Sequence, residues 1–268
     1  MASWRSDYID VDGLRLHYTR TGGDKPAIVL AHGITDDGLC WARVARALEP
    51  DFDVVMVDAR GHGRSEAPER GYGLVELAND LAGVIEGLGL ERPAILGHSM
   101  GAITTLALAG LYPQVPGAIL LEDPPAWWVE GPVPGTLDRF RSRILANQRM
   151  TRDELIAERR REQPRWHEDE LGPWADAKLR VSVSVVNRDS PRTIDWPGTL
   201  QKVICPVLLI TADPERGAIV TWESAAALST LVPQVVVAPI ADAGHSIRRD
   251  QFEGYMEMVT TFLTRTAG

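Results

Sequence analysis

The sequence predicts an α/β protein in which helices cover both faces of one mostly parallel β-sheet. Short apolar runs alternate with longer stretches of helical periodicity, which is the pattern of parallel strands joined by crossover helices. Runs such as Ala27–Ala31 are apolar throughout, as expected of strands that are buried on both faces. A length of 268 residues approaches the limit of a single hydrophobic core, so one α/β unit with an insertion fits better than two full domains.

The expected elements follow this alternation along the chain. The first two strands, Tyr8–Val11 and Leu14–Thr19, should pair antiparallel around a turn at Asp12-Gly13. The later strands are expected at Ala27–Ala31, Val54–Val57, Ala94–Leu96, Ala118–Leu121, Pro206–Ile210 and Val235–Ala238. Helices are expected at Trp41–Leu48, Leu74–Leu88, Met100–Leu111, Trp222–Leu231 and Gln251–Thr264.

The alternation stops between Ala126 and Asp195. This segment is rich in Arg, Glu, Pro and Trp, and its charges recur at helical spacing, which indicates helices with a solvated face. Its one strand-like run, Val181–Val186, carries alternating serines. We therefore predict a main domain of residues 1–125 and 196–268, and a mainly helical cap of residues 126–195 over the sheet edge.

Composition argues against several classes of function. A formal net charge of −9 disfavours a surface for nucleic acid or for anionic lipid. Cys40 and Cys205 lie far apart without CxxC spacing, and there is no GxGxxG turn or Walker loop, so no metal or other cofactor is expected. The polar N-terminus and the absence of an apolar run of about 18 residues indicate a cytoplasmic protein without a membrane partner.

The strongest chemical signal is the turn Gly97-His98-Ser99-Met100-Gly101, which lies between an apolar strand and a helix. A serine at such a turn is held in a strained conformation with its hydroxyl exposed, and the two glycines leave room for the tight bend. The following helix directs its N-terminus at the site, so the N–H of Met100 can stabilise a developing oxyanion. Ser99 is therefore the candidate nucleophile.

Serine needs a base that removes its proton during attack. We identify His245 as that base, because it follows the last strand and precedes the last helix. Loops at the carboxyl ends of parallel strands gather on one edge, which places His245 on the same edge as Ser99. The other histidines lie in an early strand, in glycine-flanked turns, beside the serine or in the charged segment, and are His17, His32, His62, His98 and His167.

Four blocks occur in an order and spacing that resemble the α/β-hydrolase superfamily nearly end to end. They are Leu30–Gly33, Asp58–Ser65, the Gly97–Gly101 turn and Ala243–His245. The resemblance implies the α/β-hydrolase fold with a cap, and hydrolysis of a small carboxylic ester or lactone through an acyl-enzyme. It also implies that the N–H of Ile34 is the second oxyanion donor beside Met100, and that the Arg60–Ser65 loop is structural.

The acid that orients His245 is open between four carboxylates. In most members of the superfamily it follows the next-to-last strand, where this chain has Asp213 and Glu215. In a minority it follows the strand after the nucleophile's helix, where the chain has Glu122 and Asp123. We favour Asp123, because a short side chain at a strand end, followed by two prolines, has few rotamers and a fixed backbone.

The substrate and the bond that is cleaved are less defined by the sequence. Trp127 and Trp128, just beyond the Asp123 loop, are the best candidates to line an apolar substrate pocket. The combination of Ser99, His245 and an orienting carboxylate also supports C–C bond hydrolysis or cofactor-free perhydrolysis. Epoxide and haloalkane hydrolysis are disfavoured, because the superfamily members that catalyse them have aspartate at the position of Ser99. A non-catalytic ligand-binding protein would typically have lost the serine or the histidine, and the oligomeric state is not predicted.

Overall fold

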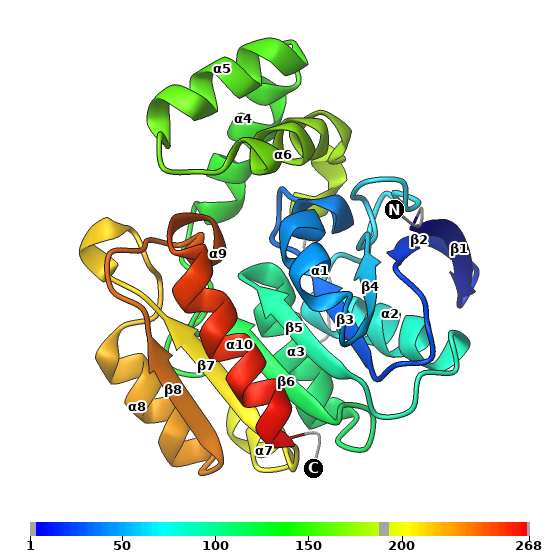
Figure 1. Ribbon diagram of the computed structural model, residues 1–268, viewed down its shortest axis with the longest axis vertical. Coiled ribbons are helices and arrows are strands. Elements are labelled where there is room, and N and C mark those ends of the chain that lie inside the picture. Colours follow the sequence, from blue (N-terminus) through cyan, green and yellow to red (C-terminus); the bar gives the residue numbers. More distant parts are fainter. Residues whose placement is uncertain (1–3, 188–192, 267–268) are drawn as a thin grey trace.

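The computed structural model describes residues 4–187 and 193–266, in which an eight-stranded sheet has the order β1-β2-β4-β3-β5-β6-β7-β8 (Figure 1). The strands are β1 (Arg5–Val11), β2 (Leu14–Arg20), β3 (Ala27–Ala31), β4 (Asp53–Val57), β5 (Ala94–His98), β6 (Ala118–Glu122), β7 (Val207–Thr211) and β8 (Val235–Pro239). The pairs β1–β2 and β2–β4 are antiparallel, and the other neighbouring pairs are parallel. The expected fold class is therefore confirmed.

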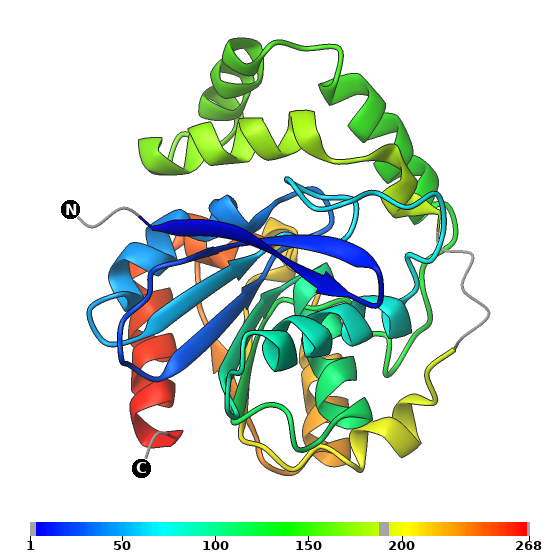
Figure 2. The ribbon, with the colours of Figure 1, turned by 90° about the vertical axis from the view of Figure 1, so that its right-hand side faces the viewer.

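Helices lie on both faces of this sheet. Around the sheet the structure has η1 (Gly38–Trp41), α1 (Ala42–Leu48), α2 (Leu74–Gly87), α3 (Met100–Leu111), α7 (Trp196–Leu200), η3 (Pro214–Arg216), α8 (Trp222–Leu231), α9 (Ile247–Asp250) and α10 (Phe252–Thr266). One face packs against α2, α3 and α8, and the opposite face packs against α1 and α10 (Figure 2). Neighbouring residues of one strand, such as Ile95 and Leu96, belong to the two opposite cores, which explains the uninterrupted apolar runs.

The expected elements agree with the structure except in the charged segment. The hairpin around Asp12-Gly13 is present, and α8 has the expected bounds. The expectation of a strand-like run at Val181–Val186 is wrong, because Val183–Val186 forms the 3₁₀ helix η2. The Ser182 hydroxyl accepts a hydrogen bond from the Ser184 N–H at 3.2 Å. Serine side chains that bind nearby backbone groups in this way compete with the strand ladder.

Between β6 and α7 the chain forms α4 (Thr136–Asn147), α5 (Arg152–Glu162), α6 (Glu168–Arg180) and η2. These helices make a separate layer beyond one edge of the sheet (Figure 1). α5 and α6 share a small apolar cluster that includes Leu155, Trp166 and Trp174. The division of the chain at residues 126 and 195 stays a prediction, and residues 188–192 lie outside the described ones. Within the described ranges, no helix is both long and apolar enough to cross a membrane.

Candidate active site

Ser99 lies at the turn between β5 and α3. Its backbone has φ 51° and ψ −112°, a conformation that residues other than glycine rarely adopt. The glycines on either side make this turn possible. A Cβ atom on Gly97 would lie 2.5 Å from the Gly101 carbonyl, and one on Gly101 would lie 2.1 Å from the Ala31 oxygen. Local strain of this kind persists only where the surrounding structure enforces it, and it is typical of functional sites.

Asp123 contacts His245 across the sheet edge. The Asp123 Oδ2 atom lies 2.6 Å from His245 Nδ1, and the carboxylate is fully buried. It also accepts hydrogen bonds from the N–H groups of Ile219 and Val220, at 2.9 Å each. The Asp123 backbone has φ 43° directly before Pro124, so chain and side chain are both held in place. This arrangement gives the imidazole a single orientation.

His98 holds the backbone of the same histidine. Its Nε2 lies 2.9 Å from the His245 carbonyl oxygen, and the two rings are 4.7 Å apart. Burial, assisted by the Arg248 charge, keeps the pKa of His98 well below its usual value, so the ring is neutral and Nε2 carries the proton. Its bare Nδ1 faces Gly33, where a Cβ atom would come within 2.9 Å. His98 therefore fits between the His245 loop and the loop after β3.

The two expected oxyanion donors are the backbone N–H groups of Ile34, in the loop after β3, and of Met100, at the start of α3. Neither Ile34 nor Met100 donates a backbone hydrogen bond within the described part of the chain. Met100 is the first residue of α3, where N–H groups have no partner inside the helix. The carbonyl oxygen of Ile34 lies 2.8 Å from His62 Nε2, and this contact holds the loop after β3 against the loop after β4. Both N–H groups are thus available to an oxygen that gains charge.

The other three carboxylates have different partners. Glu122 is fully buried and lies 3.0 Å from Arg248 NH1. Asp213 accepts a hydrogen bond from the Asp242 N–H at 2.8 Å, and Glu215 is exposed in η3. Among the four candidates, Asp123 is therefore the one that contacts His245.

The comparison with protein-family models agrees with this geometry. The model described as "Alpha/beta hydrolase family" matches residues 28–256, which is most of the chain. The chain belongs to the alpha/beta hydrolase family. Hydrolase activity is therefore the general function that the fold and the family support.

Two relatives of similar length are hydrolases whose names state a small-molecule substrate. The N-formylmaleamate deformylase of Pseudomonas putida is 31% identical, and the match covers 95% of each chain. The 2-(acetamidomethylene)succinate hydrolase of Mesorhizobium japonicum is 25% identical over 95% of this chain and 94% of that one. The crystal structure of an N-formylmaleamic acid deformylase from Pseudomonas putida superposes with a TM-score of 0.80 at 27% identity, covering 95% of this chain and all of the other.

The two tryptophans after the Asp123 loop differ in their surroundings. Trp128 lies in the core on the α3 face of the sheet, and its Nε1 donates to the Ser224 carbonyl oxygen at 2.9 Å. This contact anchors the segment to α8. Trp127 is half-buried at the margin of the same core. Of the two, Trp127 is the one that is not fully buried.

The loop from Asp58 to Ser65 serves this hydrolase as a structural anchor. The Asp58 carboxylate accepts hydrogen bonds from the N–H groups of Gly38 and Arg64, at 2.7 and 2.9 Å, and from His17 Nδ1 at 2.8 Å. Ser65 Oγ donates to the Asp58 carbonyl oxygen at 2.6 Å. His17 is thus hydrogen-bonded to Asp58 and not to a residue of the candidate active site.

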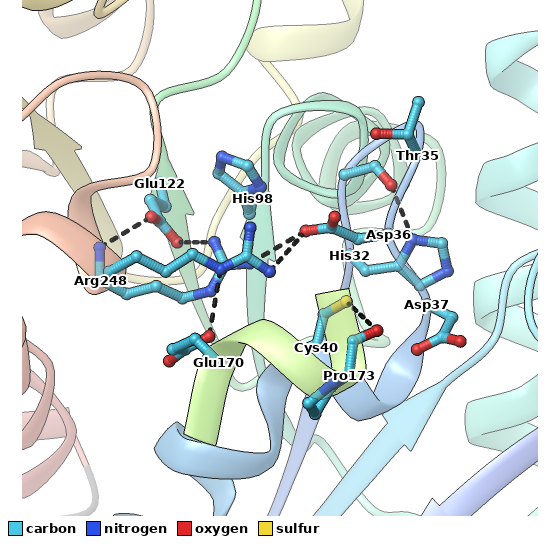
Figure 3. A network of polar contacts seen from close by, with 12 residues as sticks. His32, Thr35, Asp36, Asp37, Cys40, His98, Glu122, Glu170, Pro173 and Arg248 are labelled. Carbon is cyan, nitrogen blue, oxygen red and sulfur yellow. Dashed lines mark hydrogen bonds and ion pairs between the residues drawn. The ribbon is translucent and has the colours of Figure 1, made fainter. Parts of the chain in front are cut away.

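Sequence reasoning missed a buried charge network behind the site (Figure 3). It joins three carboxylates and three cations, which are Asp36, Glu122, Glu170, Lys178, Arg248 and Arg249. Burial acts to raise the pKa of Asp36, but the neighbouring cations, Arg249 foremost, hold it well below its usual value. No local sequence pattern predicts such a network, because its members come from distant segments and residues of these types ordinarily lie on the surface.

Proposed function

We propose that this hydrolase works through an acyl-enzyme, with Ser99 as nucleophile, His245 as general base and Asp123 as the orienting acid. The observation that carries the proposal is the 2.6 Å contact between Asp123 and His245 Nδ1, at the sheet edge where Ser99 has its strained turn. A carboxylate on Nδ1 keeps the proton on that nitrogen and leaves Nε2 free as the base. Glycine at positions 97 and 101 permits the tight turn that holds Ser99 in place.

The proposed reaction has two similar steps. His245 Nε2 accepts the Ser99 hydroxyl proton while Ser99 Oγ bonds to the substrate's carbonyl carbon. The carbonyl oxygen becomes an oxyanion, which the N–H groups of Ile34 and Met100 stabilise. When the intermediate collapses, the bond to the leaving group breaks and His245 returns the proton to that group. Water then attacks the acyl-enzyme in the same way and releases the acid.

For the substrate, we infer a small N-acyl compound whose C–N bond is cleaved. Support comes from two curated relatives that match nearly the whole chain, a deformylase of N-formylmaleamate and a 2-(acetamidomethylene)succinate hydrolase. The carboxylic ester or lactone expected from the sequence passes through the same two steps and differs only in the leaving group. No observation favours C–C bond hydrolysis or perhydrolysis on this chain.

The test combines active-site labelling with a substrate panel. We expect a fluorophosphonate to label the protein on Ser99, and we expect hydrolysis of at least one member of a panel of N-formyl amides, N-acetyl amides, p-nitrophenyl esters and lactones. Ser99→Ala should lower kcat by about 10³-fold or more, because the nucleophile is lost. Ser229→Ala is the matched control, since Ser229 Oγ bonds only within α8. Residual activity of a folded Ser99→Ala protein within tenfold of wild type would overturn the assignment.

A further inference from the structure

The helix α6 reaches from the cap layer to the loop that follows β3. Lys178, near the end of α6, is buried, and its Nζ donates to the Thr35 carbonyl oxygen at 2.7 Å and to Asp36 Oδ1 at 2.6 Å. Thr35 and Asp36 directly follow Ile34, whose N–H is a proposed oxyanion donor. One ammonium group therefore holds both the backbone and the side chain of the segment next to that donor.

The first turn of the same helix contacts α9, the short helix that directly follows the loop of His245. Glu170 Oε2 accepts a hydrogen bond from Arg249 Nε at 3.1 Å, and Arg249 follows His245 by four residues. Arg249 NH2 and Arg248 NH2 in turn donate to Asp36 Oδ2, at 3.0 and 3.2 Å. Figure 3 shows the Arg248 side chain in contact with Glu122 and with Asp36. Asp36 is thus the point where the cap helix and the two active-site loops meet.

We infer that Lys178 is a positioning residue for the oxyanion loop, through which the cap helix α6 sets the place of the Ile34 N–H. This inference rests on the proposed function. A buried ammonium group has few alternative partners, so its two short contacts restrict the loop more than an apolar side chain of the same size would. The oxyanion donor must stay within a few tenths of an ångström of its place, because a shift of about 1 Å can cost 10²-fold in rate.

The network leaves the fold a way to tolerate loss of this lysine. Without Lys178, Asp36 still contacts Arg248 and Arg249, so no carboxylate is left buried without a cation. An apolar side chain can fill the space of the lysine stem against Trp174, whose ring lies 5.1 Å from Nζ. The expected consequence of the substitution is therefore a loosened loop rather than an unfolded protein.

The test compares Lys178→Met and Lys178→Gln with the wild-type protein, using p-nitrophenyl acetate as substrate and an alkylboronic acid as tetrahedral analogue. For Lys178→Met we expect kcat to fall by about 10- to 100-fold with KM nearly unchanged. Affinity for the boronic acid should fall by a similar factor, because its tetrahedral adduct uses the oxyanion donors. Lys178→Gln keeps one N–H donor for the Thr35 carbonyl and should lose less than the methionine variant.

The control is Arg152→Gln, which breaks the exposed 2.7 Å ion pair with Asp176 inside the cap layer. It should leave kcat and boronic acid affinity unchanged, even where the melting temperature falls. Wild-type kcat and boronic acid affinity in a folded Lys178→Met protein would overturn the inference. If that variant does not fold, wild-type values in Lys178→Gln would do the same. A wild-type protein that fluorophosphonate does not label would instead refute the acyl-enzyme function itself.

Discussion

Asp123 combines two features that are rare in one residue. Its side chain is fully buried and accepts hydrogen bonds from His245 and from two backbone N–H groups. Its backbone has a positive φ immediately before a proline, which restricts the preceding residue. The two backbone contacts hold the carboxylate in the orientation in which Oδ2 meets His245 Nδ1.

We predict that Asp123→Asn lowers kcat by about 10⁴-fold, because an amide donor next to Nδ1 favours the wrong tautomer of His245. Glu215→Gln should change kcat by less than a factor of two or three, since that exposed carboxylate contributes only a screened field. Steady-state kinetics of the two variants on one substrate provide the measurement. A large loss in Glu215→Gln together with a small loss in Asp123→Asn would contradict the proposed acid.

Trp127 and Trp128 should separate binding from stability. Trp128→Phe removes the hydrogen bond from Trp128 Nε1 to the Ser224 carbonyl oxygen, and we expect the free energy of unfolding to fall by about 0.5–1.5 kcal/mol with KM unchanged. Trp127→Ala should raise KM with a smaller effect on stability, because Trp127 is half-buried. Denaturant unfolding and KM are measured for both. The reverse pattern would place Trp128, rather than Trp127, in the substrate pocket.

The Asp37 carboxylate links η1 to the end of α6. Asp37 caps η1, accepting from the Leu39 N–H at 3.1 Å, and lies 3.1 Å from Arg180 NH1. Burial, reinforced by the nearby Asp58 charge and opposed by Arg180, raises the pKa of Asp37 from its ordinary 3.8 to about 7. The junction between the cap helix and the main sheet therefore contains a group that titrates near neutral pH.

Asp37→Asn should remove a pH-dependent part of the stability. Because the pKa is higher in the folded state, the folded protein binds this proton more tightly than the unfolded chain does. The resulting stability is complete below about pH 3.8 and is lost as the pH rises through about 7.

The measurement is the free energy of unfolding of wild type minus that of Asp37→Asn. This difference should decrease between pH 4 and 7, by at most about 1.4 kcal/mol per pH unit, and then level off. Groups such as His32, whose pKa burial lowers, are present in both proteins and cancel. A flat difference for Asp37→Asn would contradict the raised pKa.

The proposed active site lies where the sheet, its covering helices and the cap layer come together. Two apolar cores hold the sheet between its helices, and a third cluster brings α4 and η2 against Ile34 and Met100, the two proposed oxyanion donors. Over the residues that the structure describes, no three histidine, cysteine or acidic side chains are grouped so that they could hold a metal ion.

We therefore predict that activity does not depend on a divalent cation. Dialysis against EDTA should leave kcat and KM unchanged within error, because the proposed reaction uses only serine, histidine, a carboxylate and backbone N–H groups. The same dialysed protein should still be labelled by fluorophosphonate. Loss of activity that a single divalent ion restores would show that the reaction follows a different course.

Much of the fold is visible in local sequence patterns. The strands are short apolar runs and the longer helices around the sheet have amphipathic or small-residue periodicity, so these elements could be predicted from residues that are neighbours in the chain. The Ser99 turn is local in the same way, because the bend needs glycine at positions 97 and 101 whatever surrounds it. The η2 segment was misread, because serine capping is a competition that alternation alone does not reveal.

The sequence also predicted that His245 lies at the same sheet edge as Ser99, because the order of strands and loops in a parallel sheet determines which loops share an edge. The choice among Asp123, Glu215, Asp213 and Glu122 did not follow, because all four lie at that edge and only distances across the fold separate them. Lys178 and its two loop contacts were equally hidden. A charged side chain on a helix has the same local sequence whether water or Asp36 receives it, and only packing of the chain against itself determines which.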